Sequence, residues 1–354
     1  MTESRKIQEI RGSYYLYLPK SWCIANQIKK NQEISIDILE DNTLLLTNKV
    51  NIHPLTGKIS INLDEFQQDN TDIFHLIFSC YICGADEIII KSNKKIKLQL
   101  RQEIDQTVRD LIDLEVFDED ENSIVIKSIG QTYEDIKSIF KRTINNVLFM
   151  LEQLSGTEDI LLNSSKNNDN TLNTENVEKS AKTIISRYNN VKRFSSFIER
   201  GIHILLRDRN LIRKLNWTAS DCIFNLIVTK YAESIGGHCS KMATLLTKLD
   251  KYPNIIQDMA KKAYQIYKDS IIVYQYGNMF EAYKIFHNHH NTNLRLDKIQ
   301  SDFLTEGNLM LYHLQRVINY SKKIAELAIH KFISKTVASS RKHALSRTDI
   351  INKK

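Results

Sequence analysis

Along the first fifty residues, apolar and polar side chains alternate in short runs that predict β-strands. Tyr14–Leu18 alternates after a turn at 11–13, and a short helix follows from Ser21. Two further strands are predicted over Glu33–Leu39 and Thr43–Thr47. Three or four strands in about 45 residues bury too little apolar surface to form a core of their own. We therefore expect this segment to complete its sheet with a second copy of itself.

Residues 54–130 switch between strand-like alternation and helix-like spacing, which is typical of a small sheet with helices packed on it. The expected elements are a strand over Lys58–Leu63, a helix over Thr71–Cys83, a strand over Glu87–Ile90, a helix over Lys97–Ile112 and a strand over Ser123–Ile129. This order predicts a small α/β segment.

From Tyr133 onward the spacing of apolar residues changes to about 3.6 and keeps that period, which predicts a helical half. The expected helices follow six apolar stripes: Ile136–Leu151, Ile184–Ile202, Ile223–Leu246, Ile255–Ile266, Phe280–Phe286 and Leu309–Phe332. The polar segment 163–176 is typical of a surface loop, and Pro253 separates the stripes into two groups of three. The pattern predicts two three-helix bundles.

An internal repeat supports this division. When the chain is shifted by 82 residues, segment 231–245 aligns with segment 313–327. Apolar positions coincide in this alignment, and His238 falls on Tyr320. The third helix of each bundle is therefore expected to be a copy of one ancestral element.

Charge is distributed unevenly along a chain whose formal net charge is +7. Lys and Arg outnumber Asp and Glu by six to two over residues 1–30, by eight to two over 187–214 and by ten to two over 316–354. Residues 113–121 hold six acidic residues and no basic one. Basic patches at both ends suit a polyanionic partner, and a solvated helix face explains each single patch as well.

The chain has no apolar run of membrane-spanning length, and its first ten residues lack the apolar core of a signal peptide. We therefore expect a soluble, cytoplasmic protein without membrane insertion. Its five cysteines are scattered, and Cys80 and Cys83 lie in an apolar run. Buried free thiols are expected there rather than a redox or metal site.

The order of turn, strand, short helix and two strands, with Gly12 and the phrase Leu18-Pro19-Lys20 at its centre, resembles the AbrB/SpoVT swapped-hairpin family. Members of that family are intertwined dimers that bind DNA through basic residues near the turn and the strand ends. The resemblance implies an N-terminal β-barrel built by two chains, in a homodimer that binds DNA.

The third helix of each predicted bundle resembles the signature helix of PhoU domains. In the two copies its positions read Glu233, Gly237, His238, Met242 and Ala243, and Gln315, Asn319, Tyr320, Ile324 and Ala325. The preceding segment FSCYICGADEIIIKS is similar to the linker of archaeal PhoU-like proteins that carry an AbrB-type N-terminus. The resemblance implies a cytoplasmic, dimeric regulator of phosphate uptake and homeostasis.

These patterns and resemblances together predict an α+β protein. The expected domains are an AbrB/SpoVT-like domain for DNA binding and dimerisation over residues 1–50, an α/β linker domain over 51–130, a first PhoU-like bundle over 131–252, a second over 253–335 and a basic C-terminal tail over 336–354. The helical half would sense a state or a partner and alter the affinity of the first domain for DNA.

PhoU domains are associated with metal clusters held by carboxylates four residues apart on a helix, an arrangement that suits hard cations. In this chain the corresponding positions are Tyr188 and Lys192, Glu233 and Gly237, and Gln315 and Asn319. Most of the carboxylates are lost and a lysine there repels a cation, so we expect no metal and no cofactor. The other metal candidate is His287, His289 and His290, which we expect in an exposed turn.

No phosphate-cradling glycine loop, nucleophile motif or zinc-protease motif is present, so an enzyme is not expected. The leading hypothesis is a DNA-binding transcription regulator. The residues expected to contact DNA are Arg5, Lys6, Arg11, Lys20, Lys29 and Lys30. The alternative is a cytoplasmic adaptor that docks on a phosphate transporter or a signalling protein without binding DNA. A metal-storage bundle is disfavoured by the missing carboxylates.

Overall fold

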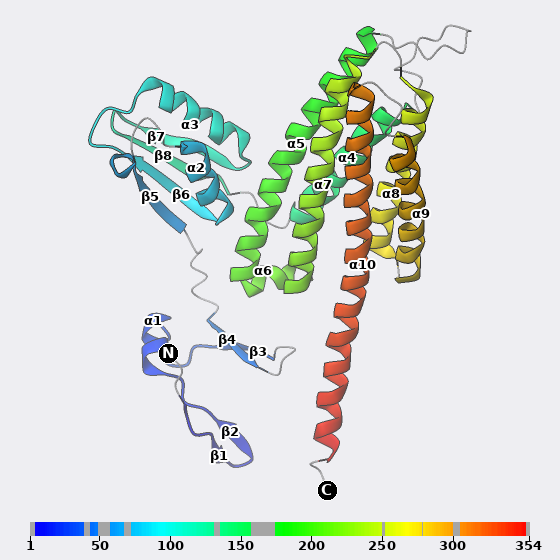
Figure 1. Ribbon diagram of the computed structural model, residues 1–354. Helices are drawn as coiled ribbons and strands as arrows, with labels where there is room; N and C mark the ends of the chain where they lie inside the picture. Colours follow the sequence, from blue (N-terminus) through cyan, green and yellow to red (C-terminus); the bar gives the residue numbers. More distant parts are fainter. Residues whose placement is uncertain are drawn as a thin grey trace. The chain divides into compact units, whose positions relative to one another are not determined.

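The computed structural model describes residues 4–38, 43–48, 57–66, 72–130, 135–156, 174–249, 252–277, 279–299 and 305–351 (Figure 1). The protein has a mixed α+β fold, as predicted, and the chain divides into two compact units. The first unit consists of residues 1–56 and 344–354, and the second of residues 57–343. None of the described helices combines the length and the apolar composition needed to cross a membrane.

The first unit contains two separate β-hairpins and a short helix. Its elements are β1 (Gln8–Ile10), β2 (Ser13–Tyr15), α1 (Lys20–Ala25), β3 (Ile34–Ile38) and β4 (Leu44–Asn48). β1 pairs antiparallel with β2, and β3 pairs antiparallel with β4. Arg11 and Gly12 make the first turn, both with positive φ (54° and 77°), which is the conformation that a two-residue hairpin turn of type I′ requires.

The first predicted strand is shorter than its alternation suggests. The ladder of β2 ends at Tyr15, and residues 16–19 have no strand partner in the described part of the chain. No sheet among the described residues closes into a barrel. The barrel that the family resemblance implies needs strands from two chains, so it stays a prediction.

The second unit begins with a four-stranded sheet and two helices (Figure 1). Its elements are β5 (Gly57–Asn62), a 3-10 helix (Leu63–Glu65), α2 (Ile73–Ile82), β6 (Ala85–Lys91), α3 (Leu98–Asp110), β7 (Leu114–Glu119) and β8 (Ser123–Ser128). The strand order is β5-β6-β8-β7; β5 and β6 are parallel, and the other neighbours are antiparallel. Ile88, Ile90 and Ile126 of the sheet form one core with Ile77 of α2 and Ile104 of α3.

Strand β7 is absent from the predicted order of elements. It forms from the acidic segment 113–121, whose composition disfavours a strand by propensity. Leu114 is buried and Val116 packs against the core, while Glu115 and Phe117 are exposed. The charges are compatible with a strand because β7 lies at the edge of the sheet, where charged side chains also discourage pairing with other chains.

The remaining elements are helical and share one hydrophobic core. They are α4 (Ile136–Ser155), α5 (Thr174–Arg207), α6 (Arg209–Lys214), α7 (Ala219–Leu246), α8 (Asn254–Tyr276), α9 (Met279–Ile299) and α10 (Thr305–Ile351), whose last residues belong to the first unit. The six predicted helices are present, and the short α6 is an addition. Residues 163–173 of the predicted loop lie outside the described part of the chain. Residues 174–176 of that loop begin α5.

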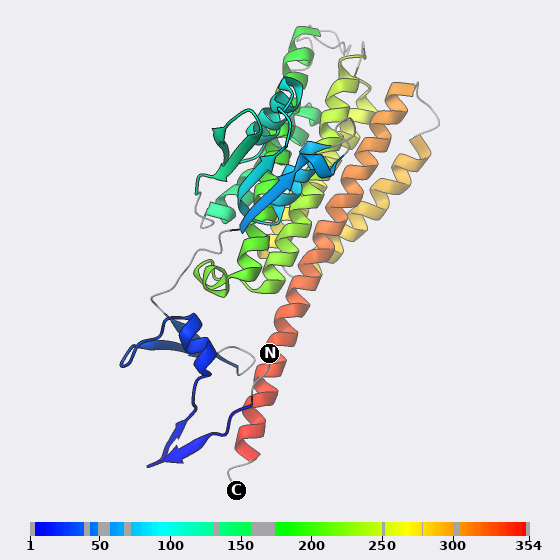
Figure 2. The ribbon, with the colours of Figure 1, turned by 90° about the vertical axis from the view of Figure 1, so that its left-hand side faces the viewer.

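Helix α10 is longer than its apolar stripe predicts. The stripe ends at Phe332, but the helix continues to Ile351, so the segment expected as a basic tail is helical as far as it is described. α10 lies alongside α7 in both views (Figures 1 and 2), and His238 of α7 and His313 of α10 are 3.0 Å apart between their Nδ1 atoms. The two repeated helices therefore pack against each other.

The expectation of buried thiols at Cys80 and Cys83 is wrong, because Cys80 is only half-buried and Cys83 is exposed. All five are free thiols, and Cys222 and Cys239 are buried. Cys83 is exposed, because it follows the last residue of α2 at the turn into β6.

The α/β part joins the helical part through Arg200 of α5, whose side chain is fully buried. Its Nη1 donates to the carbonyl oxygens of Tyr81 and Ala85, at 2.8 Å each, and its Nη2 lies 3.1 Å from a carboxylate oxygen of Asp86. Tyr81 lies in the last turn of α2, where helix carbonyls carry partial negative charge. One guanidinium therefore holds both the end of α2 and the start of β6 against α5.

The same turn is held at a second point. Arg207 Nη1 donates to the carbonyl oxygen of Cys83 at 2.8 Å. Gly84 has a φ of 86°, and a Cβ added there would meet Ile204 Cγ1 at 3.0 Å. A glycine at this position permits both the left-handed turn and the close approach of α5.

Replacing Arg200 by glutamine should destabilise the second unit strongly, because the shorter side chain leaves Asp86 and two carbonyl oxygens without their cationic partner. We expect the free energy of unfolding in urea to fall by about 3 kcal/mol. Arg193→Gln is the matched control, since Arg193 is exposed on the same helix, and it should change stability by less than about 0.5 kcal/mol. Equal effects of the two substitutions would contradict this account of the junction.

Candidate functional site

The six basic residues predicted to contact DNA all lie in the first unit and are all exposed. Arg5 and Lys6 precede β1, Arg11 lies in the turn between β1 and β2, Lys20 begins α1, and Lys29 and Lys30 follow that helix. They therefore occupy the entry of a strand, the tip of a hairpin and both ends of a helix.

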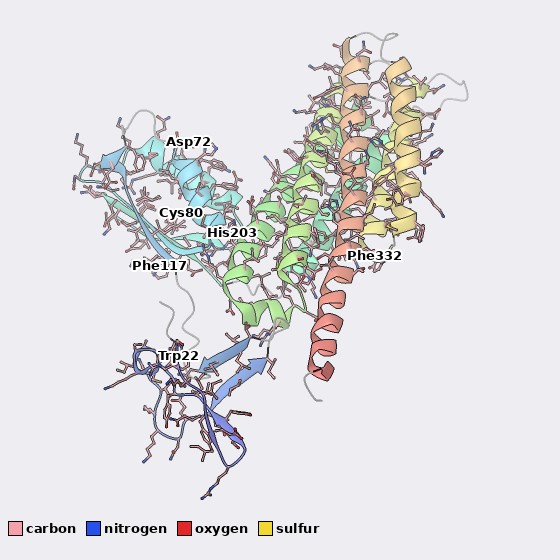
Figure 3. The ribbon with its side chains drawn as sticks, turned by 60° about the horizontal axis from the view of Figure 1, so that its bottom comes forward. Trp22, Asp72, Cys80, Phe117, His203 and Phe332 are labelled. Atoms are coloured by element: carbon pink, nitrogen blue, oxygen red, sulfur yellow. The ribbon has the colours of Figure 1, made fainter. Side chains whose placement is uncertain are left out.

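Short polar contacts hold the local structure of the first unit. Asn48 Nδ2 donates to the carbonyl oxygen of Asn26 at 2.6 Å, and Gln32 Nε2 donates to Asn48 Oδ1 at 2.7 Å. Asn26 Nδ2 in turn donates to the carbonyl oxygen of Trp22 at 2.9 Å (Figure 3 labels Trp22). These bonds connect the end of α1 to β4.

Asn48 is the only buried side chain among residues 4–38 and 43–48 for which burial is described. Most of the large apolar side chains of this stretch are exposed: Ile7, Ile10, Tyr14, Tyr15, Leu16, Tyr17, Ile24, Ile36, Ile38 and Leu44. Ile38 and Tyr14 each reach 76% exposure. Two-stranded hairpins without a hydrophobic face to pack on are marginally stable in water. The described residues of the first unit therefore form no hydrophobic core of their own, and exposed apolar side chains in this number are typical of an interface.

The helix positions at which PhoU domains carry metal-binding carboxylates hold a different set of contacts here. Lys230 Nζ lies 2.7 Å from Glu199 Oε2 and 3.3 Å from Glu233 Oε2, and Ser195 Oγ donates to Glu233 Oε2 at 2.5 Å. Although partial burial opposes its charge, the bonds to Glu199 and Glu233 raise the pKa of Lys230. An ammonium group thus neutralises the remaining carboxylates from within the chain.

An aromatic side chain fills the neighbouring space. A Cβ added at Gly237 would lie 3.2 Å from Tyr188 Oη, so this glycine makes room for the tyrosine ring. Burial, together with the nearby Glu233, raises the pKa of Tyr188. Lys192 Nζ lies 5.2 Å from the centre of the same ring. A tyrosine and a lysine in these places do not suit a cluster of hard cations.

The second copy of the motif shows the same loss. Asn319 Oδ1 accepts a hydrogen bond from His289 Nε2 at 2.8 Å, and Gln315 replaces the acidic residue one turn earlier. Within the described residues no three His, Cys, Asp or Glu side chains are grouped closely enough to hold a metal ion. The residues present therefore do not fit the metal cluster that the resemblance implies.

The prediction for the three neighbouring histidines is wrong. His287, His289 and His290 lie within α9, because the helix continues to Ile299 instead of ending in a polar turn. His289 is 9% exposed and is bonded to Asn319. Helical spacing directs His287 to solvent and His289 to the bundle, so these two histidines do not converge on one point.

A histidine pair that the pattern of residues does not predict lies between α7 and α10. His238 Nδ1 and His313 Nδ1 are 3.0 Å apart, and the ring of Tyr320 lies 6.0 Å from that of His238. Burial, His313 and the neighbouring cations Lys241 and Arg316 lower the pKa of His238 to about 4. Burial and Lys241 also lower the pKa of His313. Both rings are therefore neutral near pH 7, and one can donate its Nδ1 hydrogen to the other.

Stability should depend on this pair under acidic conditions. The folded-state pKa of His238 lies below its ordinary value of 6.5. The contribution of this histidine to the free energy of unfolding is therefore fully present above pH 6.5 and is lost as the pH falls towards 4. Over that interval the free energy of unfolding should fall by about 2 kcal/mol more in the wild-type protein than in His238→Gln. His330→Gln, at an exposed position of α10, should keep the wild-type pH profile. Urea unfolding between pH 4 and 7.5 measures the difference, and parallel profiles for the wild type and His238→Gln would refute it.

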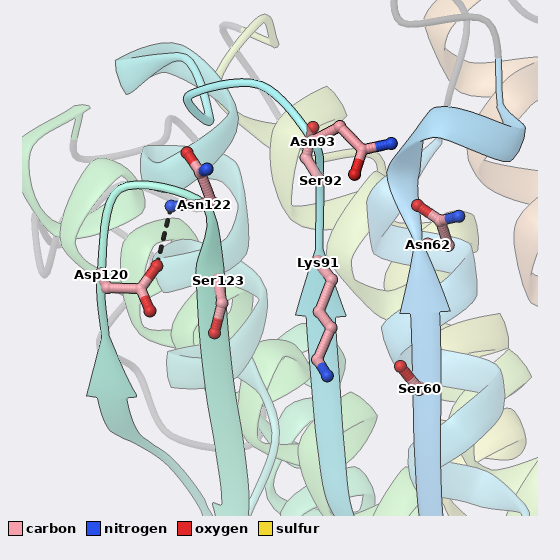
Figure 4. Close-up of a pocket in the computed structure, with 8 residues that line it drawn as sticks. All are labelled: Ser60, Asn62, Lys91, Ser92, Asn93, Asp120, Asn122 and Ser123. Atoms are coloured by element: carbon pink, nitrogen blue, oxygen red, sulfur yellow. Dashed lines mark hydrogen bonds between the residues drawn. The ribbon is translucent and has the colours of Figure 1, made fainter.

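A polar hollow of about 450 Å³ lies at the carboxyl ends of β5 and β6 (Figure 4). Its lining comes from three neighbouring strands and their loops: Ser60, Asn62, Lys91, Ser92, Asn93, Asp120, Asn122 and Ser123. The carboxyl ends of parallel strands are a frequent place for ligands. Here Asp120 accepts a hydrogen bond from the backbone N–H of Asn122 at 2.8 Å, and the lining residues include no histidine, cysteine or second carboxylate. The hollow offers hydrogen bonds but no catalytic pair.

No protein-family model, curated protein or solved structure matches this chain. A function is therefore inferred from the residues themselves. Two features of the described structure suit a binding function: the exposed cations of the first unit and its uncovered apolar surface.

Sequence patterns missed Arg200 and His313, although both have a sequence signal. Arg200 lies among apolar residues on the inward stripe of α5, and a charge in such a stripe marks a buried pair. His313 is the first residue of the second repeat copy. The segment that faces each residue could not be identified without the tertiary structure.

Proposed function

We propose that this protein is a DNA-binding regulator that acts as a homodimer, in which the N-terminal segments of two chains pair and place their cations on one surface. The single observation that carries the proposal is that the described part of the first unit combines six exposed Lys and Arg side chains with no hydrophobic core. A partner must cover the apolar surface, and a polyanion suits the cations.

A second copy of the same segment is the partner that these features favour. Each chain offers two short hairpins with open edges, and strand edges pair readily with other strands. In a twofold dimer the same apolar patch serves both chains, so each apolar side chain can be covered without another protein. The resemblance to swapped-hairpin dimers points to the same arrangement.

DNA is the favoured polyanion. Dimerisation doubles the excess of basic over acidic residues in segment 1–30, and duplex DNA presents regularly spaced phosphates that neutralise such a surface. Arg11 at a hairpin tip and Lys20 at a helix start project from the backbone at exposed places. The resemblance to PhoU proteins supports a cytoplasmic role in phosphate homeostasis, with the helical part as the sensor.

Removing cations from the first unit should weaken DNA binding and reduce its salt dependence. For Arg11→Ala combined with Lys20→Ala, we expect the slope of log affinity against log salt to decrease in magnitude by about two to four. Each lost phosphate contact contributes about 0.9, and the proposed dimer carries both substitutions twice. Fluorescence anisotropy with duplex DNA at several salt concentrations measures the slope. Lys182→Ala combined with Lys192→Ala removes two exposed lysines of α5 and should leave it unchanged. An unaltered slope in the first variant would rule out this DNA site.

Disrupting the apolar surface should separate the dimer. Ile38 is 76% exposed, and Ile38→Asp should place a charge in the interface between two chains. Sedimentation velocity should give a dimer of the 41.2 kDa chain for the wild type and a monomer for the variant. Ile223→Asp is the control, because Ile223 is exposed on α7 of the second unit. A wild-type monomer, or a variant that remains dimeric, would count against pairing through the first unit.

One observation favours the second candidate, a cytoplasmic adaptor that docks on a phosphate transporter or a signalling protein. Three aromatic side chains around the α8–α9 connection are exposed: Tyr276 (85%), Phe280 (73%) and Tyr283 (55%). Exposed aromatic residues are enriched where proteins bind proteins. Recovery of transporter subunits with the protein, without retention on genomic DNA, would favour this candidate.

A further inference from the structure

Helices α4 and α5 line an open surface cavity of about 240 Å³ in the second unit. Its lining consists of two arginines, two phenylalanines and three asparagines. The lining includes no acidic residue. Every polar side chain in the cavity is therefore a cation or a neutral amide.

The two arginines are held by a reciprocal arrangement across the helix pair. Arg142 of α4 lies over the ring of Phe194 of α5, and Arg187 of α5 lies over the ring of Phe149 of α4. The distance from the guanidinium carbon to the ring centre is 4.8 Å in both pairs. Stacking fixes the plane of each guanidinium and leaves N–H groups at its edge to bind oxygen atoms.

Asn146 lies between the two pairs and is 7% exposed. Its Oδ1 accepts a hydrogen bond from Arg187 Nη1 at 3.0 Å, and its Nδ2 donates to the backbone carbonyl oxygen of Arg142 at 2.8 Å. The buried amide thus fixes the position of Arg187. Asn145 and Asn190 add further amide groups to the lining.

The positive charge of the cavity has no internal counter-charge. Residues 136–151 of α4 and residues 179–198 of α5 include no Asp or Glu. Neither Arg142 nor Arg187 forms an ion pair with a carboxylate in the described part of the chain, whereas Arg200 on the same helix pairs with Asp86. A fixed guanidinium without a carboxylate partner retains donors for an external anion.

Cross-helix stacking by itself would stabilise the helix pair, but it does not require a concave site free of acids. The cavity of about 240 Å³ is smaller than the usual pockets for drug-sized ligands, so among small molecules it suits only a small ion. Both arginines line the same cavity and Asn146 is bonded to each of them, so a ligand with oxyanion groups at two points is the kind of anion that suits the pair.

We propose that the α4–α5 cavity is a binding site for a small anion that carries at least two negatively charged oxygen groups, either phosphoryl groups or carboxylates. Arg142 and Arg187 bind the charged groups, and the asparagines bind the remaining oxygen atoms. The site is separate from the cations of the first unit and does not depend on DNA binding.

Isothermal titration calorimetry of the full chain at constant ionic strength tests the site, with inorganic pyrophosphate and succinate as separate probes. One of the two should bind with one site per chain, which also identifies the oxyanion type. Arg142→Gln and Arg187→Gln should each weaken binding by about tenfold or more, because each removes a charge-assisted hydrogen bond. Arg187→Lys should also weaken binding, because lysine keeps the charge but lacks the planar fork.

Arg193→Gln is the matched control, since Arg193 is an exposed arginine of α5 that does not line the cavity. This substitution should leave the affinity for the probe within about twofold of the wild type, because salt screens an exposed charge outside the site. Thermal melting checks that all four variants fold. Absence of saturable binding of both probes, or equal weakening by Arg193→Gln, would overturn the proposal. If duplex DNA binds at these two arginines and neither probe does, the proposal is also wrong, and the cavity is a nucleic-acid contact instead.

Discussion

The buried guanidinium of Arg200 connects the α/β part of the second unit to its helical part. It satisfies two backbone carbonyls at the end of α2 and the start of β6 and pairs with Asp86, from a position on α5 that is closed to water. A buried charge requires partners because the cost of leaving it without them is several kcal/mol. The contacts of Arg200 therefore hold α5 against both the end of α2 and the start of β6.

The two units obtain their stability from different sources. The second unit has two extensive hydrophobic cores within its own chain. The first unit exposes its tyrosines and most of its described isoleucines, and it buries only Asn48 among the side chains described there. Under the proposed function, two first units complete each other, so dimerisation and formation of the cationic surface are one event.

The cations of the helical part have distinct roles that follow from their surroundings. Arg200 is buried and paired, Lys230 is partly buried between two carboxylates, and Arg142 and Arg187 are stacked on rings without a carboxylate. The first two neutralise charge within the protein. The last two leave a charge for a ligand to neutralise, and Arg187 directly precedes Tyr188, one of the degenerate metal positions. A sensor that responds to an anion instead of a metal is consistent with these replacements.

Local patterns by themselves determined the six long helices, most strands of the sheet and the exposed cations around Arg11, because periodicity and turn chemistry depend on neighbours in the chain. Only the tertiary structure decided contacts between distant segments. The acidic strand β7 exists because an edge position next to β8 accepts its charges, and the histidines of α9 are helical because α9 packs on the bundle. The pairings of Arg200 with Asp86 and of His238 with His313 join residues 114 and 75 positions apart. Such pairings depend on the packing of whole elements, which no local pattern encodes.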